Sequence, residues 1–265
     1  MARPRFHFVR DYRRLVRDLL AKYPLQQAMS LAVGGNYDAI GEVEKQILLG
    51  LGLQPGHTLI DVGCGSGRLA KALVPHLGPG RYFGTDILQE LLDYARVGCP
   101  ESWQFACVED IRIPFPDDCA DFASFFSVFT HLLHEESYCY LLEARRVVKA
   151  GGTIVFSFLE YEDNWPVFEN AYTALLNGEM TVHLNMFIHR DVIAAWAQRL
   201  GMSVVDMRGA NEPFVELTRP VVYDDGHCAE GVAPLGQSVC VLRNDKPAPD
   251  GRSTFRSYET SYRVV

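Results

Sequence analysis

The sequence predicts an α/β protein built on a doubly wound, mostly parallel sheet of seven strands. A β-favouring stretch at residues 59–62 runs through a loop with glycines at 63, 65 and 67 directly into a helical pattern. Strand and helix patterns then alternate four times up to residue 158. The stretch 121–128 is almost wholly apolar, as at the centre of a parallel sheet. These observations predict right-handed crossovers between neighbouring strands.

The composition allows one large core with a small appendage. The chain has 265 residues, of which 48% are hydrophobic, and its net charge is −8. Residues 1–22 carry +5, so the remainder carries −13, which disfavours nucleic acid as a partner. The basic start is interpreted as a solvated helix face, with a membrane or nucleic-acid arm as the alternative. We expect an N-terminal helical segment at 1–54, a main domain at 55–243 and a tail at 244–265.

The cysteines argue against a disulfide framework or a zinc site. They number seven and never occur as C-x-x-C, a pattern typical of a reducing compartment. No apolar run approaches 18 residues, and the N-terminus lacks the apolar region of a signal peptide. We therefore expect a cytoplasmic protein without a metal and without a membrane partner.

The element pattern is regular on both sides of one irregular segment. Residues 12–20 form an amphipathic helix that we expect to stop near Pro24, and a Gly-Gly-Asn break precedes a second helix at about 37–51. Further strands are expected at 82–86, 103–107, 121–128, 153–158, 202–207 and 236–242, with helices between them, including 135–149 and 190–200.

Residues 159–189 interrupt this alternation. They are rich in aromatics and show only a possible helix near 166–176. Because loops of this length in compact domains are usually functional or disordered, we expect an inserted cover over the carboxyl ends of the strands. A satellite aromatic core is the alternative. The tail from residue 244 is expected to be poorly ordered or to pack as an extended arm.

The glycine loop indicates which nucleotide is bound. A dinucleotide fingerprint would place a third glycine at 68, where Arg68 stands. The spacing Asp-x-Gly-x-Gly-x-Gly instead resembles the first motif of the class I S-adenosylmethionine (SAM) methyltransferases. The stretches 108–117, 127–132 and 146–152 resemble later motifs of that family, in the family's order. Glu109 replaces a common glycine and Ala150 a common proline, and neither change removes a binding group.

This resemblance, which covers about residues 55–160, implies a Rossmann-like methyltransferase fold with SAM as cofactor. The backbone of the loop can satisfy the carboxylate end of the ligand, while Asp86 would accept from the ribose hydroxyls and Asp110 from the adenine amino group. Ile87 and Ile111 would enclose the adenine. The residues expected to bind the cofactor are Asp61, Gly63, Cys64, Gly65, Gly67, Asp86, Ile87, Asp110, Ile111 and Ser127.

Several of these residues have a structural alternative. Asp86 could merely cap the following helix, and Asp110 could hold the turn after it. Cys64 is a small packing residue with no assigned chemistry. Glu109 is expected to be solvated.

The catalytic candidate is His131, which follows the fourth strand where the pocket of such a fold opens. It could instead hydrogen-bond the loop before the next helix. His183, His189 and His227 lie beside irregular segments and are weaker substrate-binding candidates, whereas His134 is expected at a helix start on the surface. The substrate-binding candidates are Tyr37, Trp165 and Phe187, and core packing is the open alternative for Tyr37.

The predicted function is SAM-dependent methyl transfer to a small molecule, with oxygen as the first choice of accepting atom and nitrogen as the second. The sequence offers no basic groove or stacking platform for nucleic acid. A methyltransferase acting on a protein or another macromolecule, docked through helix 10–22 and the tail, is one alternative. A non-catalytic SAM binder is another, and an NAD-type oxidoreductase is disfavoured by Arg68.

Overall fold

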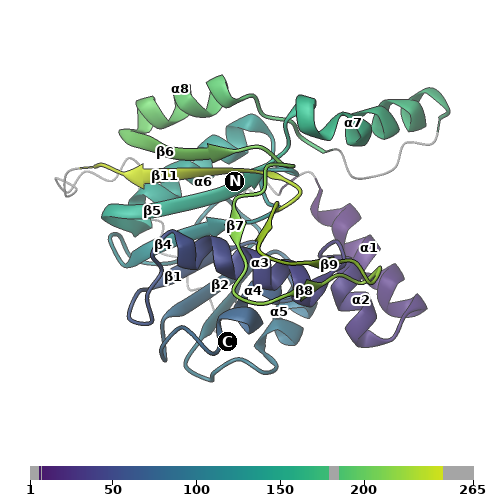
Figure 1. Ribbon diagram of the computed structural model, residues 1–265, viewed down its shortest axis with the longest axis horizontal. Helices are drawn as coiled ribbons and strands as arrows, with labels where there is room; N and C mark the ends of the chain where they lie inside the picture. Colours follow the sequence, from purple (N-terminus) through teal and green to yellow (C-terminus); the bar gives the residue numbers. More distant parts are fainter. Residues whose placement is uncertain (1–5, 7, 179–184, 247–265) are drawn as a thin grey trace, which may run out of the picture.

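One seven-stranded sheet organises the protein. The computed structural model describes residues 6, 8–178 and 185–246, and its sheet has the order β3-β2-β1-β4-β5-β11-β6. Only β11 runs against its neighbours, β5 and β6. The predicted doubly wound, mostly parallel sheet is therefore confirmed (Figure 1). The seven strands are β1 Leu59–Val62, β2 Tyr82–Asp86, β3 Gln104–Cys107, β4 Ala120–Phe125, β5 Val148–Phe158, β6 Met202–Arg208 and β11 Ser238–Asn244.

Alternation along the strands separates two apolar clusters. On β5, Ile154 and Phe156 belong to one cluster, whereas Val155 between them belongs to the other. Side chains of α6 and α8 contribute to the first cluster and those of α3 and α4 to the second. The sheet is therefore covered on both faces, as a central parallel strand requires. The helices around it are α3 Tyr37–Gly50, α4 Arg68–Leu73, α5 Gln89–Arg96, α6 His134–Val147 and α8 Arg190–Leu200.

The N-terminal segment contains one helix more than expected. Helix α1 (Val9–Lys22) ends where predicted, but Pro24 also begins α2 (Leu25–Ala32), and its carbonyl accepts from the Ala28 N–H at 2.9 Å. Proline is tolerated at a helix start because its missing N–H is not needed there. Figure 1 shows α1 and α2 (purple) together at one side of the sheet, near β8 (Val221–Val222) and β9 (Cys228–Ala229).

The irregular segment forms a helix that stands away from the body. Helix α7 (Tyr161–Leu176) is kinked at Asn164 and buries none of its residues. Figure 1 shows it extending to the upper right, away from the sheet. The possible helix predicted near 166–176 is therefore present, and it begins earlier than predicted, at Tyr161. Residues 179–184, which include His183, lie outside the described residues.

Other differences are small. Strand β4 ends at Phe125 rather than at 128, because the chain turns at Ser127 with a φ of 58°. Two short strands, β7 (Val215–Glu216) and β10 (Val232–Ala233), form a ladder that the sequence pattern did not indicate. All seven cysteines are free. None of the described helices is long and apolar enough to cross a membrane. The tail from residue 247 lies outside the described residues.

Candidate functional site

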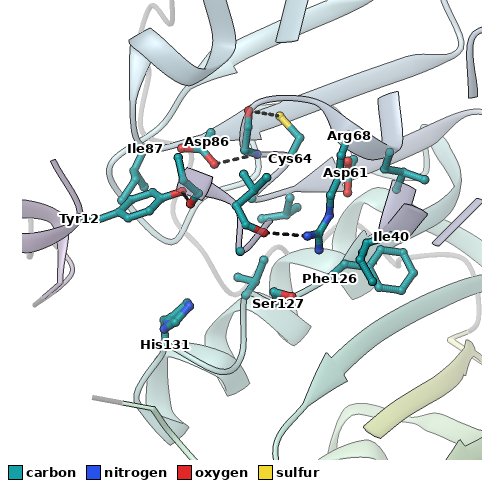
Figure 2. Close-up of a pocket in the computed structure, with 18 of the residues that line it drawn as sticks. Tyr12, Ile40, Asp61, Cys64, Arg68, Asp86, Ile87, Phe126, Ser127 and His131 are labelled. Atoms are coloured by element: carbon teal, nitrogen blue, oxygen red, sulfur yellow. Dashed lines mark hydrogen bonds between the residues drawn. The ribbon is translucent and has the colours of Figure 1, made fainter. Parts of the chain in front are cut away.

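A cavity of about 500 Å³ lies at the carboxyl ends of β1, β2 and β4. The glycine loop, the end of β2 and the turn after β4 form its floor, while α1, the α2–α3 junction and residues 235–237 form the remaining walls. Figure 2 shows Asp86, Ile87 and Tyr12 grouped at one side of this cavity and His131 on a separate wall. Parallel strands converge on such a crevice because their carboxyl ends share one edge of the sheet.

The glycine loop can adopt its conformation only if positions 63 and 65 carry no side chain. Gly63 and Gly65 have φ values of 71° and 57°, which disfavour any residue with a Cβ. A Cβ at Gly63 would lie 2.5 Å from Val128, and one at Gly65 would lie 2.5 Å from Val33. The loop is therefore closely packed between the turn after β4 and the end of α2.

Polar contacts fasten the N-terminal helices to this loop. The Ser66 hydroxyl donates to the Met29 carbonyl at 2.8 Å, and the Tyr37 hydroxyl donates to the Ser66 carbonyl at 2.6 Å. The Arg68 guanidinium donates to the Val33 carbonyl at 2.7 Å and pairs with Glu44. Burial raises the pKa of the Glu44 carboxyl, and the Arg68 charge opposes that shift. These bonds make residues 29–44 a wall of the pocket.

Asp86 sits at the end of β2 with both carboxylate oxygens in use. Oδ2 accepts from the Gly65 N–H and Oδ1 from the Leu88 N–H, each at 3.0 Å. The predicted role and its capping alternative are thus compatible, because each oxygen retains a further lone pair. Burial raises the pKa of Asp86 to about 6, against the effect of its backbone donors. The Tyr12 ring lies beside it (Figure 2).

Asp61 lies deeper, on β1. Its carboxylate accepts from the Tyr82 hydroxyl at 2.6 Å and from the Ser124 hydroxyl at 2.7 Å. Burial raises its pKa to about 7, although both hydrogen bonds favour the charged form. Asp61 and Asp86 make this half of the pocket acidic, which suits a ligand that carries hydroxyls and a positive charge.

The other half of the pocket is largely apolar. Phe126 and Leu235 supply apolar surface, and the Phe8 ring centroid lies 6.2 Å from that of His131. His131 and Gln237 bring polar groups to this half. The arrangement resembles a small-molecule site, in which a few polar groups orient a ligand within apolar walls.

The structure brings most of the predicted site residues together. Those lining the pocket are Asp61, Gly63, Cys64, Gly65, Asp86, Ile87, Ser127 and His131. Cys64 is buried, and burial raises the pKa of its thiol far above the usual range, as befits a packing residue. Gly67 does not line the pocket. It stands at the start of α4 and packs against Ala95 of α5.

Two predicted adenine contacts lie outside the lining. Asp110 accepts from the Arg112 N–H at 3.3 Å, which is its turn-holding alternative, and Ile111 packs against the core cluster of α6. Val108 occupies the lining position on that side. Glu109 was expected to be solvated but forms an ion pair with Arg13 at 2.9 Å, because α1 packs across this edge.

The predicted substrate contacts are also elsewhere. Tyr37 lies behind the glycine loop, and Trp165 projects from α7 with 48% of its surface exposed. Phe187 is buried and stacks on Tyr161 at 4.7 Å between centroids, as in the satellite-core alternative. No described residue of 159–189 lines the pocket, so the wall expected from that cover is supplied by α1 and α2.

The weaker histidine candidates have structural roles where they are described. His189 Nδ1 accepts from the Asp191 N–H at the start of α8. His134 begins α6, as expected, and bonds the Phe187 carbonyl at 3.0 Å. The His227 ring lies 5.7 Å from the ring of Tyr223 within the turn between β8 and β9. Among the described residues, no group of three or more His, Cys, Asp and Glu side chains could hold a metal ion.

Sequence reasoning missed every wall residue contributed from a distance. Tyr12 entered the prediction only as part of the amphipathic helix at 12–20, but its hydroxyl donates to the Ala32 carbonyl at 3.0 Å beside the pocket. Gln237 precedes the last strand in a stretch without any motif. The Gly-Gly-Asn break at 34–36 was the one local signal, and all three of its residues line the pocket.

Comparison with known proteins agrees with this geometry. Residues 60–156 match a family model described as a methyltransferase domain. The ubiquinone/menaquinone biosynthesis C-methyltransferase of Cupriavidus taiwanensis is 35% identical over 128 residues, covering 46% of this chain and 50% of that protein. The biotin biosynthesis bifunctional protein of Teredinibacter turnerae is 25% identical over 85% of this chain and 40% of its own length. The chain spans about half the length of the curated relatives it matches.

Solved structures share the fold at low identity. Magnesium protoporphyrin IX methyltransferase from Synechocystis, solved with bound S-adenosylhomocysteine, has a TM-score of 0.57 at 13% identity, covering 90% of this chain and 96% of that one. A SAM-dependent methyltransferase from Methanosarcina mazei has a TM-score of 0.53 at 16% identity, covering 74% of this chain and 96% of that one. These likenesses concern the fold alone.

Proposed function

Because the chain belongs to the class I SAM-dependent methyltransferase family, we propose that it transfers a methyl group from SAM to a carbon atom of a small, largely apolar acceptor. The observation that carries the proposal is a pocket with two unlike halves, one acidic around Asp61 and Asp86 and one apolar around His131. A cationic cofactor and an apolar acceptor would meet where the halves join.

The residues present fit SAM. Each oxygen of Asp86 accepts one backbone N–H and retains a lone pair, so the pair can accept from the two ribose hydroxyls. Ile87 and Val108 offer apolar surface for the adenine. Asp61 lines the same half, and its charged form would be favoured by the positive ammonium and sulfonium of the methionine end.

Carbon replaces oxygen and nitrogen as our preferred accepting atom. Several curated relatives are named as C-methyltransferases of ubiquinone/menaquinone biosynthesis. Quinol rings contain electron-rich carbons beside oxygen substituents and are otherwise apolar, which matches the apolar half of the pocket. We therefore propose an oxygen-substituted aromatic ring as the acceptor class.

The chain's own contribution is alignment and proton removal. When bound, SAM would supply an electrophilic methyl group, and the carbon–sulfur electron pair would pass to sulfur as the acceptor carbon formed its new bond. His131 lines the apolar half, and we propose that it takes the proton that the acceptor carbon releases. The walls formed by α1 and α2 keep water from the reacting atoms, which favours in-line transfer.

The alternative of a macromolecular substrate would have to use a helix that also packs against the pocket. Helix α1 buries Val9 and Val16 and pairs Arg13 with Glu109, so one of its faces is a wall of the pocket, while Arg10, Arg14 and Arg17 remain exposed on the other. The tail, which was the second docking element, lies outside the described residues.

Calorimetry and product analysis test the proposal. We expect S-adenosylhomocysteine to bind and NAD not to bind. With isotopically labelled SAM and a panel of phenols and hydroquinones led by naphthalene-1,4-diol under reducing conditions, we expect a ring-methylated product. NMR of that product separates a new C–CH₃ group from a methyl ether. Binding without turnover of any panel member would leave a SAM-binding protein and contradict the acceptor class.

A further inference from the structure

A polar triad joins the ends of three strands beside the apolar half of the pocket. The Ser127 N–H donates to Ser157 Oγ at 2.7 Å, and the Ser157 hydroxyl donates to Gln237 Oε1 at 2.7 Å. The Ser127 hydroxyl reaches the same oxygen at 3.2 Å. We propose that this triad orients Gln237 so that its amide N–H groups bind an oxygen substituent of the methyl acceptor. The inference rests on the proposed function and names how that site selects its substrate.

The hydrogen bonds determine which way the amide faces. Ser157 is fully buried, and its oxygen already accepts the Ser127 N–H, so its one hydrogen needs an acceptor. Gln237 Oε1 is that acceptor, whereas a flipped amide would present N–H groups and leave the hydroxyl hydrogen without a partner. Oε1 receives both serine hydroxyls, and the two N–H groups are therefore directed away from the serines.

These N–H groups have no partner within the described part of the chain. Gln237 is half-buried and lines the pocket. An oxygen atom of a ligand bound in the pocket could therefore accept the hydrogen bonds that no described protein atom accepts from this amide. Its neighbours on this wall, Leu235 and Phe126, are apolar. A pair of donors in an apolar wall selects a ligand that is apolar apart from a correctly placed oxygen.

The triad is rigidly supported. Ser127 has a φ of 58°, an uncommon value for a residue with a side chain, and its bonds to Ser157 and Gln237 hold it there. On the other side, the Ser238 hydroxyl donates to Glu160 at 2.7 Å, and Arg190 bonds the two oxygens of Glu160 at 2.7 and 2.9 Å. The backbone that carries Gln237 is thus anchored before a ligand arrives, which lowers the entropic cost of ordering it.

The position in the sheet places Gln237 at the acceptor rather than the cofactor. Asp86 ends β2 and Gln237 precedes β11, and β1, β4 and β5 separate these strands in the sheet order. With the cofactor's ribose at Asp86, a ligand group at Gln237 belongs to the acceptor. An oxygen held there pushes electron density into its ring, and a neighbouring ring carbon is the atom turned toward the methyl group.

Two substitutions separate donation from simple packing. Gln237→Glu keeps Oε1 for the two serines and replaces the N–H groups by a carboxylate oxygen of nearly the same size. Gln237→Met removes the donors without adding charge, but it also removes Oε1, the acceptor of the two serine hydroxyls, so its thermal stability is compared with that of Gln237→Glu. Gln198→Glu, on an exposed position of α8, is the matched control. We expect both Gln237 variants to lower kcat/KM for naphthalene-1,4-diol by roughly 10- to 100-fold, while their affinity for S-adenosylhomocysteine stays within about twofold of wild type.

A binding cycle tests the same contact without turnover. The dissociation constants of 1-naphthol and of naphthalene, which lacks the oxygen, are measured on protein saturated with S-adenosylhomocysteine. We expect the preference for 1-naphthol, expressed as the ratio of the two constants, to fall about tenfold in Gln237→Met relative to wild type. Thermal unfolding of each variant checks that the triad remains folded.

These experiments distinguish failure of the inference about Gln237 from failure of the proposed function. If wild type methylates no panel member but the ratio still falls in Gln237→Met, the acceptor class is wrong and the role of Gln237 stands. An unchanged ratio, absent binding of both probes, or impairment in Gln237→Glu alone would overturn the inference. In the last case the added charge, not the lost donors, would explain the effect.

Discussion

At the scale of single residues, the pocket depends on carboxylates that the fold removes from water. Asp86 is 7% exposed and Asp61 is 3% exposed. Burial raises their pKa values to about 6 and about 7. Both groups are therefore costly to keep charged in the empty pocket, and a ligand with donors or positive charge relieves that cost.

Replacing Asp86 tests its role at the ribose. Asp86→Asn keeps the size of the side chain but removes one acceptor and the charge, so we expect cofactor affinity to fall roughly 10- to 100-fold. Asp93→Asn, an exposed acid on α5, should leave the affinity unchanged. Titration calorimetry with S-adenosylhomocysteine measures both, and equal effects would show that the ribose lies elsewhere.

The raised pKa of Asp86 also predicts linked proton release. At pH 6 the empty pocket holds this carboxyl partly protonated, and ribose hydroxyls that donate to it favour the charged form. Binding should therefore release protons, and affinity should fall as the pH drops below about 6. Calorimetry in buffers of different ionisation enthalpy detects the release, which we expect to be lost in Asp86→Asn.

Asp61 should make the stability of the ligand-free protein depend on pH. Its pKa is raised in the folded state, so its contribution to the free energy of unfolding is greatest below about pH 4 and is lost as the pH rises toward 7. The slope should reach up to about 1.4 kcal/mol per pH unit. Asp61→Asn should flatten the decline measured by denaturant unfolding between pH 5 and 8. A decline unchanged by the substitution would assign it to other groups.

At the scale of elements, the glycine loop and α2 depend on each other. Gly65 lies against Val33 so closely that a Cβ has no room, and Ser66 bonds the carbonyl of Met29 within α2. The loop that would hold the cofactor is therefore also the surface against which α2 packs. Damage to this contact should affect stability and ligand binding together.

Gly65→Ala tests this coupling. We expect it to lower the free energy of unfolding by about 2–4 kcal/mol, from a left-handed backbone and a clash with Val33. Gly98→Ala has a φ of 87° but open space around its Cβ, so it measures backbone strain alone. We expect Gly65→Ala to lose more free energy of unfolding than Gly98→Ala. Adding Val33→Ala to Gly65→Ala should remove this difference, because it makes room for the new Cβ. Equal costs for the two glycine variants would mean that no clash occurs.

At the scale of the whole molecule, the pocket is closed by segments far apart in the chain. The Asn36 N–H donates to the Asp224 carboxylate at 2.7 Å, and the Asp224 N–H donates to the Asn36 side chain at 2.8 Å. This reciprocal pair joins the α2–α3 junction, which lines the pocket, to the turn between β8 and β9.

Breaking the pair should speed release of the cofactor. We expect Asp224→Ala, and Asn36→Gly with its left-handed backbone preserved, each to raise the dissociation rate of S-adenosylhomocysteine roughly three- to tenfold. The double variant should add little, because the two residues share one contact. Asp225→Ala, which removes a bond within the same turn, is the control. Stopped-flow fluorescence measures the rates, and additive effects would contradict a shared contact.

The local sequence was sufficient to predict those pocket residues that lie at the end of a strand. Asp61, Asp86 and the glycines follow directly from β1 and β2, because parallel strands deliver their carboxyl ends to one edge of the sheet whatever lies around them. Helix α2 was missed because Pro24, which ends one helix, also begins the next. The described residues of 159–189 do not line the pocket, and composition could not have shown this, because it indicates that aromatic side chains need burial but not against which surface.

The sequence by itself therefore determined the sheet, its crossovers and the acidic half of the pocket, since these depend on periodicity and on motifs of adjacent residues. Only the tertiary structure decided which distant residues complete the walls of the pocket. Tyr12, Asn36 and Gln237 come to the pocket from residues that are far apart in the chain, and no periodicity records which distant segments will pack together. Their positions follow from close packing against the glycine loop and from buried hydrogen bonds that form only once the whole core has assembled.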